Sequence, residues 1–236
     1  MSTNFAYGWY DQDASVEIRS PAETSVFSNR ASPQTVTELK NAELEKVLAV
    51  QPDSFLGWSC RGYALNQLGA YEAAIASYEK AFQYCINDYR AWYNYSSALM
   101  HLERFAEAIV GYDKVIALKP DYHRAWYYRG KALHRMGKYG EAVESFEHTL
   151  AFRPQSFKTW QHRGYALAKL GRYQEAVNSF DQALRSLSHN ADLWQQRGAA
   201  LQYLGHYLDA LNSFDQALLI RPQNPYLWYR RGLTLG

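Results

Sequence analysis

The stretch FLGWSCRGYALNQLGAYEAAIASYEKAFQYCIND (55–88) decides the fold, because its pattern returns along the rest of the chain. Tryptophan marks the period, since six of them follow one another at intervals of 34 residues: Trp58, Trp92, Trp126, Trp160, Trp194 and Trp228. A fixed period of this length is the signature of a tandem repeat protein, in which each unit packs against its neighbours.

With Phe55 as position 1, positions 4, 8 and 11 hold Trp, Gly and Leu, which fall on one face of a helix over positions 2–14. Positions 20, 24, 27 and 28 form the apolar face of a second helix. Glycine at position 15 predicts the end of the first helix, and proline near the repeat boundary predicts the end of the second. The glycine at position 8 lies opposite Ala at position 20, which predicts close approach of the two helix backbones.

This pattern resembles the tetratricopeptide repeat family, of the bacterial type, over residues 55–236. The departures are Ser96 for glycine, Glu103 for the turn glycine, and Ile86 and Ser188 for proline. The resemblance implies an all-α fold, a right-handed α-solenoid of tandem 34-residue helix-turn-helix repeats whose first helices line the concave side.

The domain organisation follows from the same register. Residues 1–34 have no periodicity and predict a disordered tail, in which the aromatic FAYGWY segment (5–10) is either part of a tether or a docking segment. Residues 35–236 predict the solenoid, with twelve helices. Its expected parts are a half-repeat capping helix (35–54), five repeats (55–88, 89–122, 123–156, 157–190 and 191–224) and a partial repeat (225–236). The partial repeat is either a cap or the start of further sequence in a longer parent protein, and its exposed Leu233 and Leu235 favour the longer parent. Self-association through this incomplete repeat is a further expectation.

Composition excludes several classes of protein. The chain has 236 residues and a net charge of +2, too small a charge to indicate a nucleic-acid binder. It has neither an apolar run long enough for a membrane span nor a secretory signal, and Cys60 and Cys85 form no disulfide framework, so we expect a cytoplasmic protein.

No catalytic or nucleotide-binding motif is present. His134, His162 and Cys60 are too few and too dispersed for a metal site. We therefore expect no enzymatic activity, cofactor or metal.

Charge is divided between the two helices of each repeat. In the five repeats the first helices (positions 1–14) carry ten Lys or Arg and one acid, Asp192, whereas the remaining positions carry fourteen acids and nine bases. A concave wall of one sign attracts a partner of the opposite sign. The expected partner-binding residues are Arg90, Tyr93, Asn94, Arg124, Tyr127, Tyr128, Lys131, His134, Arg135, Lys158, His162, Tyr165 and Lys169.

A second set of arginines lies at position 7, beside tryptophan on the buried face: Arg61, Arg129, Arg163, Arg197 and Arg231. Because a buried charge needs a partner, the carboxylates at position 25 predict a structural ladder of ion pairs. The sequence does not decide whether each pair lies within one repeat or between neighbours. The second repeat has Tyr95 instead, with Asp113 as a candidate partner.

The predicted function is a non-catalytic scaffold that holds a protein or peptide, with an acidic segment or a carboxyl terminus, in a basic, tyrosine-lined groove. Relatives that bind chaperone tails use Lys and Asn at positions 5 and 9, and only Lys131 matches that clamp, which argues against this ligand. The alternatives are a single-stranded RNA or polyanion binder, in which bases stack on aromatic rings, and the targeting or regulatory domain of a larger protein.

Overall fold

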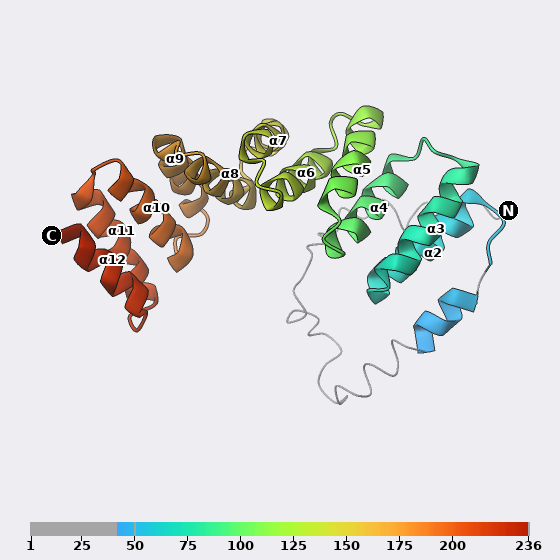
Figure 1. Cartoon of the computed structure of the whole chain (residues 1–236), viewed down its shortest axis with the longest axis horizontal. Coiled ribbons are helices and arrows are strands. Elements are labelled where there is room, and N and C mark those ends of the chain that lie inside the picture. Colours follow the sequence, from blue (N-terminus) through green and yellow to red (C-terminus); the bar gives the residue numbers. More distant parts are fainter. Residues whose placement is uncertain (1–41, 50, 236) are drawn as a thin grey trace. The chain divides into compact units, whose positions relative to one another are not determined.

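The computed structural model describes residues 42–49 and 51–235, and all regular structure in these ranges is helical (Figure 1). The prediction of an all-α solenoid of tandem helix pairs is confirmed. A helix over residues 42–49 is followed by α2 (Phe55–Leu68), α3 (Tyr71–Tyr84), α4 (Tyr89–His101), α5 (Phe105–Leu118), α6 (His123–Arg135), α7 (Tyr139–Phe152), α8 (Phe157–Lys169), α9 (Tyr173–Leu184), α10 (Ala191–Tyr203), α11 (Tyr207–Ile220) and α12 (Pro225–Leu235). The predicted tail (1–34) and the start of the predicted capping half-repeat (35–41) lie outside the described residues.

The chain divides within α4 into two compact units. Unit 1 ends at Ala98 and unit 2 runs from Leu99 to Gly236. In unit 2 each first helix packs on the second helix of its own repeat, and that helix packs on the first helix of the next repeat. The first helices also meet one another directly, because α6 contacts α8 and α8 contacts α10. Their surfaces are therefore neighbours.

An aromatic ring from the second helix fills the space that the glycine of the first helix leaves open. A Cβ atom on Gly164 would lie 2.5 Å from Cε1 of Phe180, and one on Gly130 would lie 2.7 Å from Cε1 of Phe146. Both phenylalanines are fully buried. The expected close approach opposite the alanine at position 20 is therefore wrong, because the group that needs the space is the ring at position 24.

The tryptophans at position 4 are not fully buried, which corrects their placement on the buried face. Trp228 is exposed and the other five are half-buried. From the second repeat on, their indoles bind the backbone just before each first helix. The indole N–H of Trp126 donates to the carbonyl of Pro120 at 2.9 Å. That of Trp194 donates to the carbonyl of Ser188 at 2.8 Å. Since the acceptor is a backbone oxygen, serine replaces proline there without losing the bond. Small residues of the first helices, such as Ala125 and Ala132, are fully buried.

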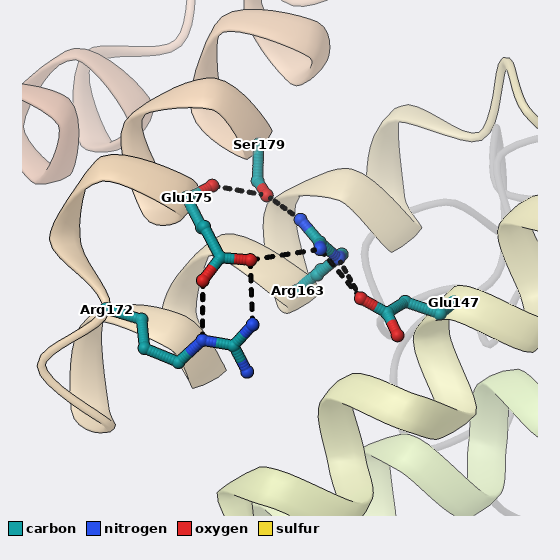
Figure 2. Close-up of polar contacts among 5 residues, drawn as sticks. All are labelled: Glu147, Arg163, Arg172, Glu175 and Ser179. Carbon is teal, nitrogen blue, oxygen red and sulfur yellow. Dashed lines mark hydrogen bonds and ion pairs between the residues drawn. The ribbon is translucent and has the colours of Figure 1, made fainter.

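The position 7 arginines connect neighbouring repeats, as Figure 2 shows for Arg163. Its guanidinium donates to Glu147 of the preceding repeat at 2.7 Å and to Ser179 Oγ of its own repeat at 2.8 Å. The Ser179 hydroxyl in turn donates to the carbonyl of Glu175, 2.9 Å away. Glu175 is also held by Arg172, at 2.6 Å. One side chain thus joins three helices.

The same ion pair recurs along unit 2, always between repeats. It joins Arg129 to Asp113, Arg197 to Asp181, and Arg231 to Asp215, each at 2.6 Å. The predicted ladder is confirmed, and its open question is answered in favour of neighbouring repeats. Asp113, the suggested partner of Tyr95, accepts a hydrogen bond from Arg129.

In unit 1 the corresponding arginine binds backbone oxygens. Arg61 donates to the carbonyls of Val47 and Leu48 at 3.2 and 3.3 Å. These carbonyls belong to the last turn of the helix over residues 42–49, where backbone acceptors have no partner within the helix. The arginine therefore caps that helix.

The turns between the two helices of a repeat use left-handed backbone. Gly137 has φ of 76°, as expected for a residue that ends a helix. Glu103 takes the same place in the second repeat with φ of 58°, a conformation that costs a residue with a Cβ atom about 1 kcal/mol. Its carboxylate accepts a hydrogen bond of 2.7 Å from Arg135 of the next repeat.

Candidate functional site

Two neighbouring first helices of unit 2 each carry a row of basic and aromatic side chains at positions 2, 6, 9 and 13. The α6 row consists of Arg124, Tyr128, Lys131 and Arg135. The α8 row consists of Lys158, His162, Tyr165 and Lys169. Residues at this spacing fall within about 60° of one another around a helix, so each row is one continuous strip.

Lys131 is the central cation of the α6 row and is half-buried. Its Nζ lies 5.7 Å from the ring centroid of Tyr127 and 5.4 Å from that of Tyr128, in range of cation–π attraction. Burial lowers the pKa of Lys131, and the positive charges of Lys158 and Arg135 lower it further. Among the described residues, Lys131 forms no ion pair with a carboxylate.

His162 lies at the middle of the α8 row among aromatic rings. Its imidazole is stacked on Phe146 with ring centroids 5.9 Å apart. Tyr127 approaches its edge at 5.7 Å, and Tyr165 at 6.3 Å. The Tyr165 hydroxyl accepts a hydrogen bond of 2.9 Å from the amide of Gln161, which leaves the hydroxyl proton available for another acceptor.

The charge state of His162 follows from these surroundings. Burial lowers its pKa to about 4, helped by Lys131, His134 and Lys158. The imidazole is therefore neutral at pH 7. Burial also raises the pKa of Tyr127 and that of Tyr165. The middle of the two rows is accordingly polar but uncharged, except for Lys131.

His134 lies at position 12 of α6, behind the rows. Its Nε2 is buried and accepts or donates no hydrogen bond among the described residues. Burial lowers the pKa of His134, as do the charges of Lys169 and Arg135. At the same position of the fifth repeat, Gln202 donates to the carbonyl of Arg230 in the next repeat at 3.2 Å. The amide found in the fifth repeat thus makes a bond that the imidazole does not make.

Arg135 is the member of the α6 row that already holds a carboxylate. Besides its bond to Glu103, its guanidinium lies over the ring of Phe105, 4.8 Å from the centroid. Position 13 therefore reaches toward the turn of the preceding repeat. Arg135, an expected partner-binding residue, therefore shares its charge with Glu103.

The remaining cations stand at the ends of the rows. Arg124 is half-buried, whereas Lys158 and Lys169 are exposed. Lys158 Nζ lies 5.9 Å from the ring centroid of Phe157. Neither Arg124 nor Lys169 forms an ion pair within the part of the chain that the structure describes. We call the α6 row, the α8 row, Tyr127 and His134 together the cationic cluster.

Three predicted residues belong to unit 1. Arg90 donates to the hydroxyl of its neighbour Tyr89 at 3.1 Å. The carbonyl of Asn94 accepts a hydrogen bond of 2.9 Å from Asn66, and Tyr93 is half-buried. The other ten of the thirteen predicted residues lie on α6 and α8 of unit 2.

Two residues of the cluster were missed in the sequence. His101, the last residue of α4, lies near Lys131: burial lowers the pKa of His101 most, and the charge of Lys131 lowers it further. Its place at position 13 was a signal, because Arg135 and Lys169 hold that position in later repeats. Phe146 was assigned to the core by its position 24, and it is also the floor on which His162 stacks.

Family models recognise the repeats directly. Models described as Tetratricopeptide repeat match residues 41–84, 123–156, 157–190 and 191–224, and one described as TPR repeat matches residues 97–137. Together these matches cover more than half of the chain. The protein belongs to the tetratricopeptide repeat family.

Several solved structures of tetratricopeptide repeat proteins share the fold at low sequence identity. The crystal structure of YrrB, described as a TPR protein with an unusual peptide-binding site, has a TM-score of 0.71 and 18% identity, covering 83% of this chain and 99% of that chain. MamA (41–end) from Desulfovibrio magneticus RS-1 has a TM-score of 0.68 and 19% identity, covering 74% and 99%. No match to a curated protein is found.

Within residues 42–49 and 51–235, no three His, Cys, Asp or Glu side chains are placed to hold a metal ion. No helix in these ranges has the length and apolar character needed to cross a bilayer. Cys60 and Cys85 are both exposed free thiols.

Proposed function

We propose that this tetratricopeptide repeat protein is a non-catalytic interaction scaffold whose cationic cluster binds an acidic peptide segment of a partner protein. The family is one of protein-interaction scaffolds, and the relative YrrB is described as having a peptide-binding site. Beyond this general role, we place the binding site on α6 and α8 and propose that its ligand is negatively charged.

The observation that carries the proposal is that Lys131 and Lys169 lack a paired carboxylate in the described part of the chain, although other cations lie near them. Lys131, Lys158 and Arg135 lie close enough that the first has its pKa lowered by the other two. Bringing like charges together costs free energy, and a ligand carboxylate recovers that cost on binding.

The aromatic side chains add contact area to this electrostatic attraction. Tyr127, Tyr128 and Tyr165 are half-buried, so their rings are held by packing before a ligand arrives. Ordered aromatic side chains lose little further entropy on binding, which is why they often anchor interfaces. Tyr93, Asn94 and Arg90 are proposed as partner-binding residues of unit 1.

The test compares fluorescein-labelled peptides of equal length that are rich in Glu, in Lys or in Ser. We expect the Glu-rich peptide to bind, and its affinity to fall by about tenfold as salt rises from 50 to 300 mM. Lys131→Glu should weaken binding at least about tenfold. Lys114→Glu makes the same charge change on α5, a second helix, and serves as the control that leaves affinity near wild type.

Equal binding of the Glu-rich and Lys-rich peptides at 50 mM salt would overturn the proposal. So would equal loss of affinity in the Lys131 and Lys114 variants, because net charge alone would then explain the effect. Circular dichroism on each variant checks that the helices remain.

A polyanion remains the alternative ligand, because Tyr127 and Tyr128 adjoin Lys131 as stacking rings adjoin cations in single-strand binders. A twelve-nucleotide oligouridine used as competitor distinguishes the two. The peptide proposal expects displacement of the Glu-rich peptide only at millimolar oligonucleotide. Displacement at micromolar concentration would favour the nucleic acid.

Two smaller proposals accompany the scaffold. Self-association through the C-terminal helix is proposed because Trp228, Leu233 and Leu235 of α12 are 53%, 58% and 62% exposed. Sedimentation velocity of wild type and Leu235→Glu tests it, and a monomer in both would contradict it.

A cytoplasmic location is proposed from the presence of only two cysteines.

A further inference from the structure

Both rows of the cationic cluster have a cation at each end. In the α8 row these are Lys158 and Lys169, eleven residues apart, and in the α6 row Arg124 and Arg135 have the same separation. At 1.5 Å per residue, the two ends of each row are separated by about 16 Å along the helix. The positive charge is thus divided between two places rather than spread evenly.

The section between the two ends has a different chemistry. It consists of aromatic rings, the neutral imidazole of His162 and the hydroxyl of Tyr165, which retains a proton to donate. Only Lys131 carries charge there, partly covered by two tyrosine rings. A carboxylate has little to gain there beyond Lys131, whereas an apolar side chain and a backbone carbonyl both find partners.

The neighbouring first helix α10 limits this arrangement. At positions 2, 6, 9 and 13 it carries Asp192, Gln196, Ala199 and Tyr203 and no cation. Asp192 forms an ion pair of 2.7 Å with Arg221 and raises the pKa of Tyr165, so it faces the edge of the α8 row with negative charge. The charged ends of the α6 and α8 rows therefore have no counterpart on α10.

We propose that the ligand of this site is an extended peptide with two acidic groups about five residues apart and an uncharged, partly apolar stretch between them. This inference rests on the proposed function and adds a spacing rule to it. An extended chain advances about 3.3 Å per residue, so five residues span the 16 Å between the ends. Arg124 and Lys158 hold one acidic group, and Lys169, with part of the charge of Arg135, holds the other.

An extended ligand fits the middle section better than a helical one. A helix satisfies its own backbone hydrogen bonds and would need about eleven residues between its acidic groups. An extended chain presents free carbonyl groups, which the Tyr165 hydroxyl and other polar groups of the wall can bind. Peptide spacing therefore reports the conformation of the bound ligand.

The experiment uses the full chain and fluorescein-labelled peptides in which two Glu-Glu pairs flank spacers of one to twelve Ser, Gly and Ala residues. At constant charge, we expect affinity to be highest when the pairs are four to six residues apart. Separations of two or of eleven residues should bind at least about fivefold more weakly. An optimum near eleven, or affinity that does not vary with spacing, would overturn the inference.

Variants at the two ends provide an independent reading. Lys158→Gln with Lys169→Gln removes one cation from each end and leaves Lys131 in place, so the optimum should disappear while weak, salt-dependent binding remains. The control is Lys114→Gln with Lys119→Gln, which removes the same amount of charge from α5 and from the residue that follows it. In this control the optimum should persist. An optimum that survives the first pair of substitutions would contradict the assignment of the ends.

The inference and the proposed function fail in different ways. If Glu-rich peptides bind and Lys131→Glu weakens them, but spacing has no effect, the acidic-peptide site stands and the spacing rule is wrong. If no Glu-rich peptide binds at low salt, the proposed function itself is wrong, and the spacing rule fails with it.

Discussion

The carboxylate of Asp181 accepts a hydrogen bond of 2.6 Å from Arg197, sixteen residues further along the chain and in the next repeat. The same guanidinium donates to Ser213 Oγ at 2.6 Å and lies over the ring of Trp194, 5.7 Å from its centroid. One arginine thus fixes the angle between successive helix pairs. The pair is only partly shielded, because the two side chains are 21% and 45% exposed.

Asp181→Asn should lower the free energy of unfolding by about 1 kcal/mol, because partial exposure screens the ion pair and an amide still accepts one hydrogen bond. Urea unfolding followed by circular dichroism measures this. Glu144→Gln, a carboxylate on an exposed site of α7, is the control, with a change below about 0.5 kcal/mol. Equal changes in the two variants would mean that Asp181 does not stabilise the interface between repeats.

Glycine to alanine substitutions should have opposite effects at two helical sites. Gly164→Ala should destabilise the protein by about 1–3 kcal/mol, since the added Cβ would meet Phe180 at 2.5 Å. Gly140→Ala in the first turn of α7 meets nothing within 4 Å and should stabilise by up to about 1 kcal/mol. Thermal melting of both variants decides the matter, and a stabilised Gly164 variant would show that the ring moves freely.

The period of the repeat was enough to predict the helix pairs, because Trp and Leu recur in the first helix, Ala recurs in the second, and glycine marks the turn between them. It was not enough to say what fills each space. Gly164 lies opposite both an alanine and a phenylalanine in the sequence register, and only coordinates show that the ring of Phe180 occupies the gap. The half-burial of Trp126 was missed for a similar reason, since its indole N–H needs a backbone acceptor at the surface of the repeat.

Glu103→Gly should stabilise the protein by about 0.5–1 kcal/mol. Glycine relieves the left-handed backbone at φ of 58°, while the ion pair lost with Arg135 is exposed and contributes little. The reverse change at an equivalent turn, Gly171→Glu, should destabilise by a similar amount. Chemical denaturation of both variants tests this, and a destabilised Glu103 variant would mean that the pair with Arg135 outweighs the strain.

Stability should fall as the pH is lowered from about 6.5 to 4, in part because of His162. Its pKa drops from 6.5 to about 4 on folding, so within this window the unfolded chain binds a proton that the folded chain does not. The contribution of the neutral His162 imidazole to the free energy of unfolding is fully present above pH 6.5 and is lost as the pH falls to about 4.

His162→Gln places at this site the residue that Gln196 supplies in the fifth repeat, and it should reduce the slope of stability against pH between 5.0 and 7.0. Titration of carboxylates affects wild type and variant alike, so the difference between the two slopes isolates the imidazole. Identical slopes would mean that His162 titrates normally in the folded protein.

The cationic cluster was predictable in its membership but not in its internal pairing. Counting charges by helix identified Lys131, Lys158 and Lys169, because a stripe on a helix follows from spacing alone. That Arg135 would turn to Glu103 depends on the unusual turn of the second repeat, and that His101 would join from α4 depends on how successive helices pack. Such contacts between repeats lie beyond a pattern read within one repeat.

The ion pair between repeats also bears on how such a protein changes its length during evolution. Loss of residues 157–190 as one unit would place Arg197 where Arg163 now stands, opposite Glu147. Arginine and carboxylate would meet again at the new junction, with serine at position 23 retained. In-frame duplication or loss of a repeat therefore leaves this junction chemically intact, whereas a deletion of any other length would separate donor from acceptor.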